Sequence, residues 1–273
     1  LPILLIYISS FTAEAAIQSD GFSLWPKEWS TAAYEMMFKD GAQIAQSYLV
    51  SIVLTVLGTV LSILIMTMYA YALARKEFAF RQVLTFFAYF TMLFSGGMVA
   101  SYMINTTVFH LRNTFWVLLL PGMCGAYNII VLRTFFTTAG TESIIEAAKI
   151  DGAGEFRIYG QIILPLSKPA IATIGLFTAI MYFSKWFDVM LYIDKPNLYT
   201  VQYLLMRVMK NIEFIRGNPE FAMTEEGIEM MRNMPNESAK MALTVIAMTP
   251  VLVFYPFFQK YFVKGLVLGA VKG

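Results

Sequence analysis

Residues Tyr48–Ala74 read YLVSIVLTVLGTVLSILIMTMYAYALA, an apolar stretch without one charged side chain. This stretch exceeds the roughly 20 residues with which an α-helix crosses a bilayer. A second long apolar run covers Phe115–Phe136 and is of comparable length. Because a spanning segment must satisfy its backbone hydrogen bonds internally, both runs predict transmembrane helices. The expected fold class is therefore an all-α membrane protein.

The overall composition points the same way. The chain has 273 residues, of which 58% are hydrophobic and 14% are charged, whereas a soluble domain carries about 25% charged residues. Cys124 is the only cysteine and His110 the only histidine, so the sequence predicts neither a metal site nor an internal disulfide. It contains no phosphate loop and no G-x-S-x-G motif, and we expect no catalytic residues. The net charge of +2 gives no reason to expect a nucleic-acid partner.

Apolar runs separated by polar stretches predict six spanning helices within one transmembrane domain, residues 1–273. The expected spans cover about 1–11, 47–74, 80–96, 114–136, 166–193 and 241–263. The first run is too short to cross a bilayer alone. We expect it to be the outer end of a truncated first helix. An uncleaved signal peptide is the alternative, although no positively charged segment precedes the run.

The basic residues of the short connections predict the orientation. One side receives the segment 137–165, a tail at 264–273 and the connection after residue 74, with ten basic and five acidic residues. The other side, including the loop 194–240, carries nine basic and twelve acidic residues. The sequence therefore predicts a cytoplasmic segment 137–165, a cytoplasmic C-terminus and an outer loop 194–240. Within that loop, apolar residues at helical spacing between Leu198 and Ile215 predict an amphipathic helix. Such a helix would lie on the membrane or a partner, or against this protein's own outer face.

The segment with the most specific pattern, Thr141–Pro165, reads TESIIEAAKIDGAGEFRIYGQIILP. Thr141 is the expected N-cap of a first helix, and Gly152 fits the position after that helix, where a positive φ is commonly required. A second short helix begins at about Glu155 and runs to Pro165, which resets the chain. The pattern predicts a helix–glycine–helix hairpin that suits a groove on another protein. An ordinary amphipathic linker between two spans is the alternative.

The spacing in this segment resembles the EAA motif of bacterial ABC-importer permeases. Glu146-Ala147-Ala148 is followed by three residues, then Gly152, then nine residues and Ile-Ile-Leu-Pro. Other runs are similar to the carbohydrate (MalG-like) permeases, above all to their LplC/YtcP branch. These runs are LFSGGMVASYMI (93–104), RNTFWVLLLPG (112–122), RTFF (133–136), WFDVMLYI (186–193) and FVKGLVLGAVKG (262–273). The resemblance covers nearly the whole chain, but it offers no role for the Met-rich segment 221–234.

The resemblance implies a multi-pass permease in the bacterial cytoplasmic membrane that imports a carbohydrate by alternating access. It implies three kinds of partner besides lipid and excludes nucleic acid: a second homologous permease, a pair of ATP-binding-cassette ATPase subunits and an extracytoplasmic solute-binding protein. ATP and Mg would be bound by the ATPase, and this chain would bind no cofactor.

Carried over residue by residue, the ATPase-docking elements are Glu146, Ala147, Ala148 and Gly152, with Asp151 fixing the turn. The tail residues Ala270, Val271, Lys272 and Gly273 are a second expected ATPase contact, with a frayed basic end near lipid headgroups as the alternative.

Charged residues within the predicted spans are few, which weighs against an ion-gradient-driven secondary transporter, the competing class. Lys185 and Asp188 are the exception, one helical turn apart in the fifth predicted span. Together with Trp186 they are candidates for lining a sugar path, because an aromatic ring stacks on sugar rings. A structural salt bridge near the interface is the alternative.

Overall fold

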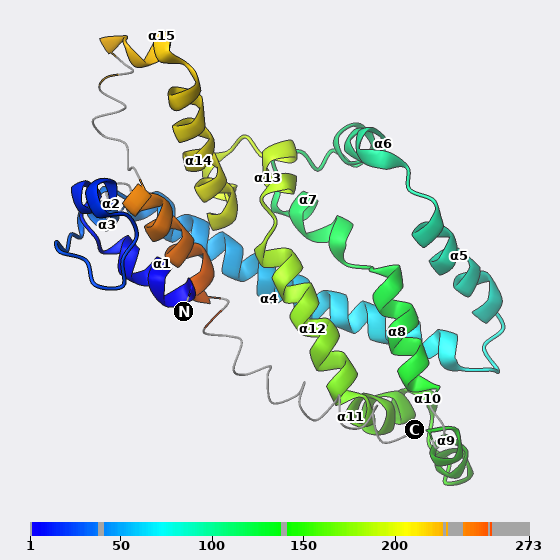
Figure 1. The fold of residues 1–273 in the computed structure, drawn as a ribbon. Helices are drawn as coiled ribbons and strands as arrows, with labels where there is room; N and C mark the ends of the chain where they lie inside the picture. The colour runs from blue at the N-terminus through cyan, green and yellow to red at the C-terminus, as the bar shows by residue number, and fades with distance from the viewer. Residues whose placement is uncertain are drawn as a thin grey trace. The chain divides into compact units, whose positions relative to one another are not determined.

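The computed structural model describes residues 2–37, 41–137, 141–225, 228, 237–250 and 252 (Figure 1). The helices are α1 (Pro2–Ser10), α2 (Glu14–Asp20), α3 (Ala32–Met37), α4 (Gly41–Ala74), α5 (Arg81–Leu93), α6 (Gly97–Met103), α7 (Phe115–Leu119), α8 (Ala126–Phe136), α9 (Thr141–Ile150), α10 (Glu155–Ile158), α11 (Leu164–Leu166), α12 (Lys168–Phe183), α13 (Phe187–Tyr192), α14 (Val201–Gly217) and α15 (Pro219–Ala222). Residues 237–250 are also helical. Within the described residues, β-structure is limited to an isolated bridge between Thr12 and Trp29. The prediction of an all-α fold is confirmed.

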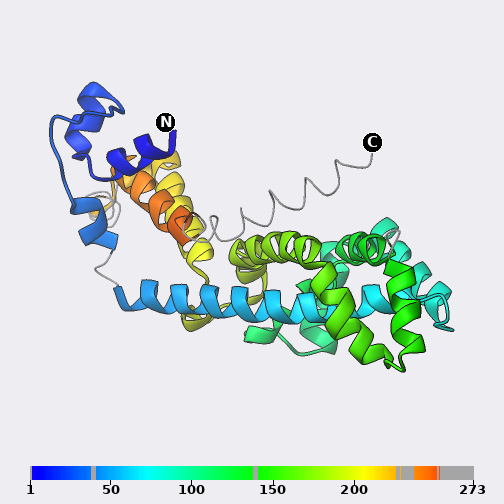
Figure 2. The same ribbon diagram turned by 90° about the horizontal axis from the view of Figure 1, so that it is seen from below.

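Helix α4 contains the apolar stretch predicted to span the membrane and runs unbroken from Gly41 to Ala74 (Figure 2). Its many straight-chain and small apolar residues favour a helix, and no proline interrupts it. Among the described residues it is the one helix long and apolar enough to cross a membrane by itself. It begins before Ser47, the predicted start of the span, and ends at the predicted residue.

Three further pairs of helices reach the length and hydropathy of a span only when each pair is taken together. The bend is 117° between Arg81–Leu93 and Gly97–Val108, 44° between Phe115–Gly122 and Ala126–Phe136, and 80° between Glu155–Leu166 and Lys168–Phe183. The structure therefore offers up to four spans by length and composition within the described residues. Six spans remain a prediction.

The bends show where the predicted boundaries differ from the structure. The span predicted at 114–136 is broken because Pro121 lies in a 3-10 turn and Gly125 has an extended backbone. The span predicted at 166–193 ends at Phe183, and α13 follows as a separate helix. Between α5 and α6 the chain turns at Gly97, whose φ is +78. Only glycine adopts this backbone conformation without strain.

The chain divides into two compact units, and the division falls inside α4. The first contains the described residues up to Ser51 and those from Lys185 onward. In it the Glu14 carboxylate accepts hydrogen bonds from the backbone N–H groups of Glu237 (3.1 Å) and Ser238 (3.0 Å), and from the Ser238 hydroxyl (2.9 Å). The side chain of Gln43 donates to the Pro196 carbonyl over 2.8 Å. The helix predicted in the outer loop is confirmed as α14.

Glu14 thus caps the helix of residues 237–250 from a distant part of the chain, and its negative charge faces the positive end of the helix dipole. We expect Glu14→Ala to weaken the first turn of this helix by about 1 kcal/mol, which corresponds to about fivefold faster amide exchange there. Hydrogen-exchange mass spectrometry of the purified chain checks this. Glu35→Ala is the matched control, because Glu35 is bonded within its own segment, to the Thr31 hydroxyl. Equal protection in the Glu14 variant and the control would contradict the cap.

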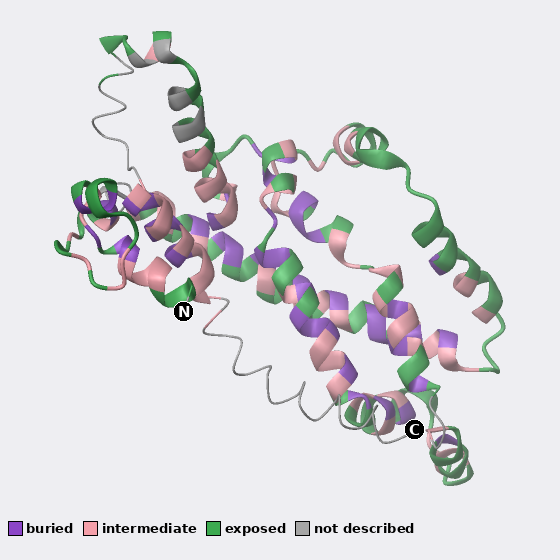
Figure 3. Cartoon of the chain, in the orientation of Figure 1, coloured by how far each residue is buried: buried purple, intermediate pink, exposed green. Residues whose placement is uncertain are grey.

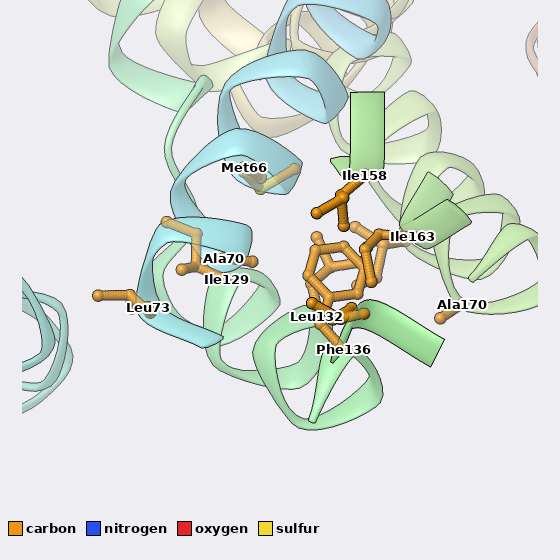
Figure 4. Close-up of a cluster of buried hydrophobic side chains, with 11 residues drawn as sticks. Met66, Ala70, Leu73, Ile129, Leu132, Phe136, Ile158, Ile163 and Ala170 are labelled. Atoms are coloured by element: carbon orange, nitrogen blue, oxygen red, sulfur yellow. The ribbon is translucent and has the colours of Figure 1, made fainter. Parts of the chain in front are cut away.

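The second unit, Ile52–Ser184 in its described part, contains a buried cluster contributed by α4, α8, the segment after α8 and α12. Its members are Met66, Ala70, Leu73, Ile129, Leu132, Phe136, Ile145, Ile158, Ile163, Ala170 and Ile174 (Figure 4). Many other apolar side chains are exposed, notably along α5 and α6 (Figure 3). Leu93 is 77% exposed and Val99 68%. Exposed apolar faces of this size are typical of a chain that contacts lipid or partner subunits.

A second contact in this unit joins α4, α12 and the last residue of α7. The Tyr182 ring is fully buried, its hydroxyl donates to the Leu119 carbonyl over 2.9 Å, and it lies 3.2 Å from the Ser62 hydroxyl. Gly58 faces this ring so closely that a Cβ atom there would stand 2.6 Å from it. Gly58 and Ser62 form a small-x-x-x-small pair, which permits this close approach of the helices.

Candidate functional site

The hairpin predicted at residues 141–165 is present and is called the hairpin below. Its first arm, α9, ends in a Schellman cap: the N–H of Ala153 donates to the Ala148 carbonyl over 2.9 Å, and the N–H of Gly152 donates to the Lys149 carbonyl over 3.0 Å. The φ of Gly152 is +77, which confirms the predicted conformation. Thr141, the predicted N-cap, is the first residue of α9.

The second arm is less regular than predicted. It consists of α10, a π-helical turn at Tyr159–Ile163 and α11, which ends at Leu166, one residue beyond the predicted end. The chain then bends by 80° into α12. Pro165 and Pro169 flank the bend, and neither has a backbone N–H with which to continue a regular helix through it.

One face of the hairpin is buried and the other is open. Ile145 and Ile158 are buried in the cluster shared with α4 and α8, and Ala148 is half-buried against the same cluster. The other predicted docking residues are exposed: Glu146, Ala147, Asp151 and Gly152. Two large apolar side chains accompany them, with Ile150 87% and Phe156 84% exposed. The structure therefore places Ala148 among the supporting residues and leaves the other four on an open surface.

A closed ring of alternating charges lies where the two arms meet the end of α4. It consists of Arg75, Glu77, Lys149 and Glu155 and is called the charge ring below. The Arg75 Nη2 atom lies 2.9 Å from Glu77 Oε2 and 3.3 Å from Glu155 Oε1. The Lys149 Nζ atom lies 2.6 Å from Glu77 Oε2 and 3.3 Å from Glu155 Oε1. The Tyr71 hydroxyl also donates to Glu155.

The pairing of Glu77 with Lys149 predicts a pH dependence. The hydrogen bond from Lys149, and then the charge of Arg75, hold the pKa of the Glu77 carboxyl below its ordinary value of 4.5. The hydrogen bond to Glu77 raises the pKa of Lys149 above its ordinary value of 10.5. A lowered carboxyl pKa stabilises the fold above pH 4.5 and ceases to do so as the pH falls through the folded value. A raised lysine pKa stabilises it below pH 10.5 and ceases to do so as the pH rises through the folded value.

We therefore expect the melting temperature of wild type to exceed that of Glu77→Gln by a constant amount across neutral pH. The difference should disappear below pH 4.5, as the Glu77 carboxyl becomes protonated in the folded state. Thermal unfolding in detergent at a series of pH values measures this. A difference that grew on acidification would contradict the pairing.

The other predicted site residues are not part of the hairpin. Lys185 and Asp188 belong to the first unit, where their side chains form an ion pair of 2.7 Å and are 8% and 34% exposed. Trp186 is half-buried, and its ring lies 5.6 Å from that of Phe187, edge to face. The tail residues Ala270–Gly273 lie outside the described residues. Within the described ranges, no group of three or more His, Cys, Asp or Glu side chains is arranged to hold a metal ion.

From the sequence, the four members of the charge ring entered only the count of charges that predicts the orientation, and no site was expected at them. Glu155 is about eighty residues from Arg75, so no local spacing connects them. The one sequence signal is their position at helix ends: Lys149 lies in the last turn of α9 and Glu155 in the first turn of α10. Each charge there complements the dipole of its own helix.

Comparisons with known proteins show the family to which the chain belongs. The family model described as "Binding-protein-dependent transport system inner membrane component" matches residues 66–267. The polygalacturonan/rhamnogalacturonan transport system permease protein YtcP of Bacillus subtilis (strain 168) is 38% identical over all of this chain and 92% of its own length. Protein LplC of the same organism is 36% identical over all of this chain and 89% of its own.

A solved structure is similar to this chain in both fold and sequence. It is a bacterial ABC transporter involved in the import of the acidic polysaccharide alginate, and the matched chain is similar with a TM-score of 0.82. The two are 30% identical, and the similarity covers 96% of this chain and 90% of the other. The family is a transport component rather than an enzyme. This chain belongs to the family of inner membrane components of binding-protein-dependent transport systems.

Proposed function

We propose that this chain is one of two permease subunits of an ABC importer that carries an oligosaccharide or a modified sugar across the bacterial cytoplasmic membrane. The observation that carries the proposal is the hairpin: its EAA spacing is combined with an open surface formed by Glu146, Ala147, Asp151 and Gly152. The similarity to YtcP, whose name specifies polygalacturonan and rhamnogalacturonan, and to the alginate importer supports a carbohydrate as the cargo.

The energy for transport would come from other subunits. The sequence has no phosphate loop, so ATP and Mg would be bound by a pair of ATPase subunits, one of which docks on the hairpin. A second permease would complete the path, and an extracytoplasmic solute-binding protein would deliver the sugar. The tail residues 270–273 would reach a second contact with the ATPase, and six spans with a cytoplasmic C-terminus would embed the chain in lipid.

The docking surface has the chemistry that this role requires. Ala147 and Gly152 are small enough for a partner backbone to approach closely, while the Glu146 carboxylate offers an acceptor to an arginine or to N–H groups. Ile150 and Phe156 provide exposed apolar surface of the kind that forms the centre of an interface. In this mechanism, ATP-driven closure of the ATPase pair moves the hairpin, and the cavity between the permeases switches its access.

Lys185, Trp186 and Asp188 are this chain's proposed contribution to the sugar path. Lys185 and Asp188 form an ion pair at the start of α13, and the Trp186 ring lies edge to face against that of Phe187. An indole ring held in this way is a stacking surface for a sugar ring.

Transport measured in liposomes tests the proposal. The complete importer, purified through a tag on this chain, is reconstituted with its binding protein and a panel of labelled oligosaccharides that includes uronic-acid oligomers. We expect uptake to require ATP and the binding protein and to be unaffected by collapse of proton and sodium gradients. Uptake driven by either gradient without an ATPase subunit would instead establish a secondary transporter and overturn the proposal.

A further inference from the structure

The charge ring joins three elements that must move together in the proposed transport cycle. Arg75 and Glu77 lie within three residues after the end of α4, Lys149 lies in the last turn of α9, and Glu155 begins α10. The pairs to Lys149 and Glu155 therefore connect the end of α4 to both arms of the hairpin at its Gly152 turn. Within the ring, two cations and two carboxylates alternate, so the charges cancel.

Attachment of the hairpin does not depend on this ring. Ile145 and Ile158 are buried in the cluster with α4 and α8. Burial of such apolar side chains stabilises far more than an exposed ion pair does. The ring instead fixes the orientation of the hairpin relative to α4. Its contacts hold the turn of the hairpin at one position relative to the last residue of α4.

Arg75 is the member best suited to this task. Its side chain is 13% exposed, against 35% for Lys149, 49% for Glu155 and 66% for Glu77. A guanidinium stays charged at any physiological pH and holds two carboxylates in a fixed planar geometry. Without Arg75, Lys149 is the one cation of the ring that contacts Glu77 and Glu155, and the ion pair that links Glu155 to the end of α4 is lost.

We propose that Arg75 is a positioning residue that makes α4 follow the hairpin, so that movement of the docked ATPase is passed to this spanning helix. The inference rests on the proposed function and adds the link between docking and the transport path. From α4 the movement reaches α12 through the close contact of Gly58 with the Tyr182 ring. Arg75 itself touches neither ATPase nor sugar in this account.

The test compares Arg75→Gln with Lys76→Gln in the complete reconstituted importer. Lys76 is the matched control: it is adjacent in sequence and pairs with Glu142 of the same hairpin over 2.6 Å, but the two side chains are 71% and 61% exposed. Two quantities are measured, the amount of ATPase subunit that co-purifies and the ratio of sugar imported to ATP hydrolysed.

We expect Arg75→Gln to retain the ATPase subunit and its hydrolysis while the import ratio falls about tenfold. Arg75→Lys should recover most of the ratio, and Lys76→Gln should leave it unchanged. If Arg75→Gln does not accumulate as folded protein, Glu155→Gln, which keeps the size of its side chain, should give the same fall. The double variant Arg75→Gln/Glu155→Gln should be no worse than the single one, because both substitutions break the same contact.

An unchanged ratio in Arg75→Gln or Glu155→Gln would overturn the inference, and so would an equal fall in Lys76→Gln. Failure of the proposed function gives a different result. In that case, the wild-type chain itself would neither retain an ATPase subunit nor import sugar with ATP.

Discussion

The Gly58→Leu substitution is expected to prevent most of the chain from accumulating in a folded form. A Cβ atom at position 58 would stand 2.6 Å from Tyr182 Cε2 and 2.7 Å from two more ring atoms. The ring is fully buried, and its hydroxyl is held by the Leu119 carbonyl and Ser62. Overpacking a tight site costs about 1–3 kcal/mol and occasionally more, and here the clash is with a rigid ring rather than with the end of a flexible side chain.

The measurement is fluorescence-detected size-exclusion chromatography of the detergent-extracted chain after heating. Gly175→Ala is the matched control, since it adds a Cβ to another buried helical glycine, at an ordinary 3.9 Å from Ile63. It should keep the wild-type melting temperature. The double variant Gly58→Ala/Tyr182→Ala should recover part of what Gly58→Ala loses. A wild-type melting temperature for Gly58→Leu would show that α4 and α12 do not pack in this way.

The Ala147→Arg substitution is expected to separate the chain from its ATPase without unfolding it. Ala147 is exposed on the open face of the hairpin, so a large charged side chain meets no neighbour within the free subunit. On docking, it would occupy the space that the partner backbone needs. Central interface residues change binding by 2 kcal/mol or more, which is roughly a thirtyfold loss of affinity, and uptake should fall with it.

Co-purification of the ATPase subunit and sugar uptake in liposomes measure this effect. Ala79→Arg is the control, because Ala79 is also an exposed alanine of the second unit but lies in the connection between α4 and α5. Both variants should keep the wild-type melting temperature, and only Ala147→Arg should lose the ATPase. Normal co-purification of Ala147→Arg would exclude the hairpin as the docking element.

Part of the fold was predictable because local rules determine it. The end of α4 was predictable because the unbroken apolar run ends at Ala74. The end of α9 was predictable because a positive φ is required after the helix and Gly152 supplies it. The sequence shows a proline at position 121, but it does not predict how far this proline changes the direction of the helix. A proline in a spanning segment is compatible with both a continuous kinked helix and a break. The outcome depends on how neighbouring helices satisfy the released backbone groups.

The parts that could not be predicted arise from contacts between distant residues. The Arg75–Glu155 pair and the cap that Glu14 provides for residues 237–250 each join segments separated by many helices. The difference in burial among the residues of the EAA motif also depends on contacts between distant residues. Glu146, Ala147 and Ala148 are adjacent in sequence, but only the fold shows that Ala148 packs inward while the other two remain open.

Cysteine cross-linking from position 147 tests the central claim most directly. Cys124, the single cysteine of the chain, is replaced by serine, and Ala147→Cys or Ala79→Cys is introduced into the complete importer. A short bifunctional reagent is then added, and mass spectrometry identifies the linked peptides. We expect position 147, and not position 79, to link to a subunit that carries a phosphate loop. A complex that retains this subunit but yields no link from position 147, or equal links from both positions, would contradict the claim.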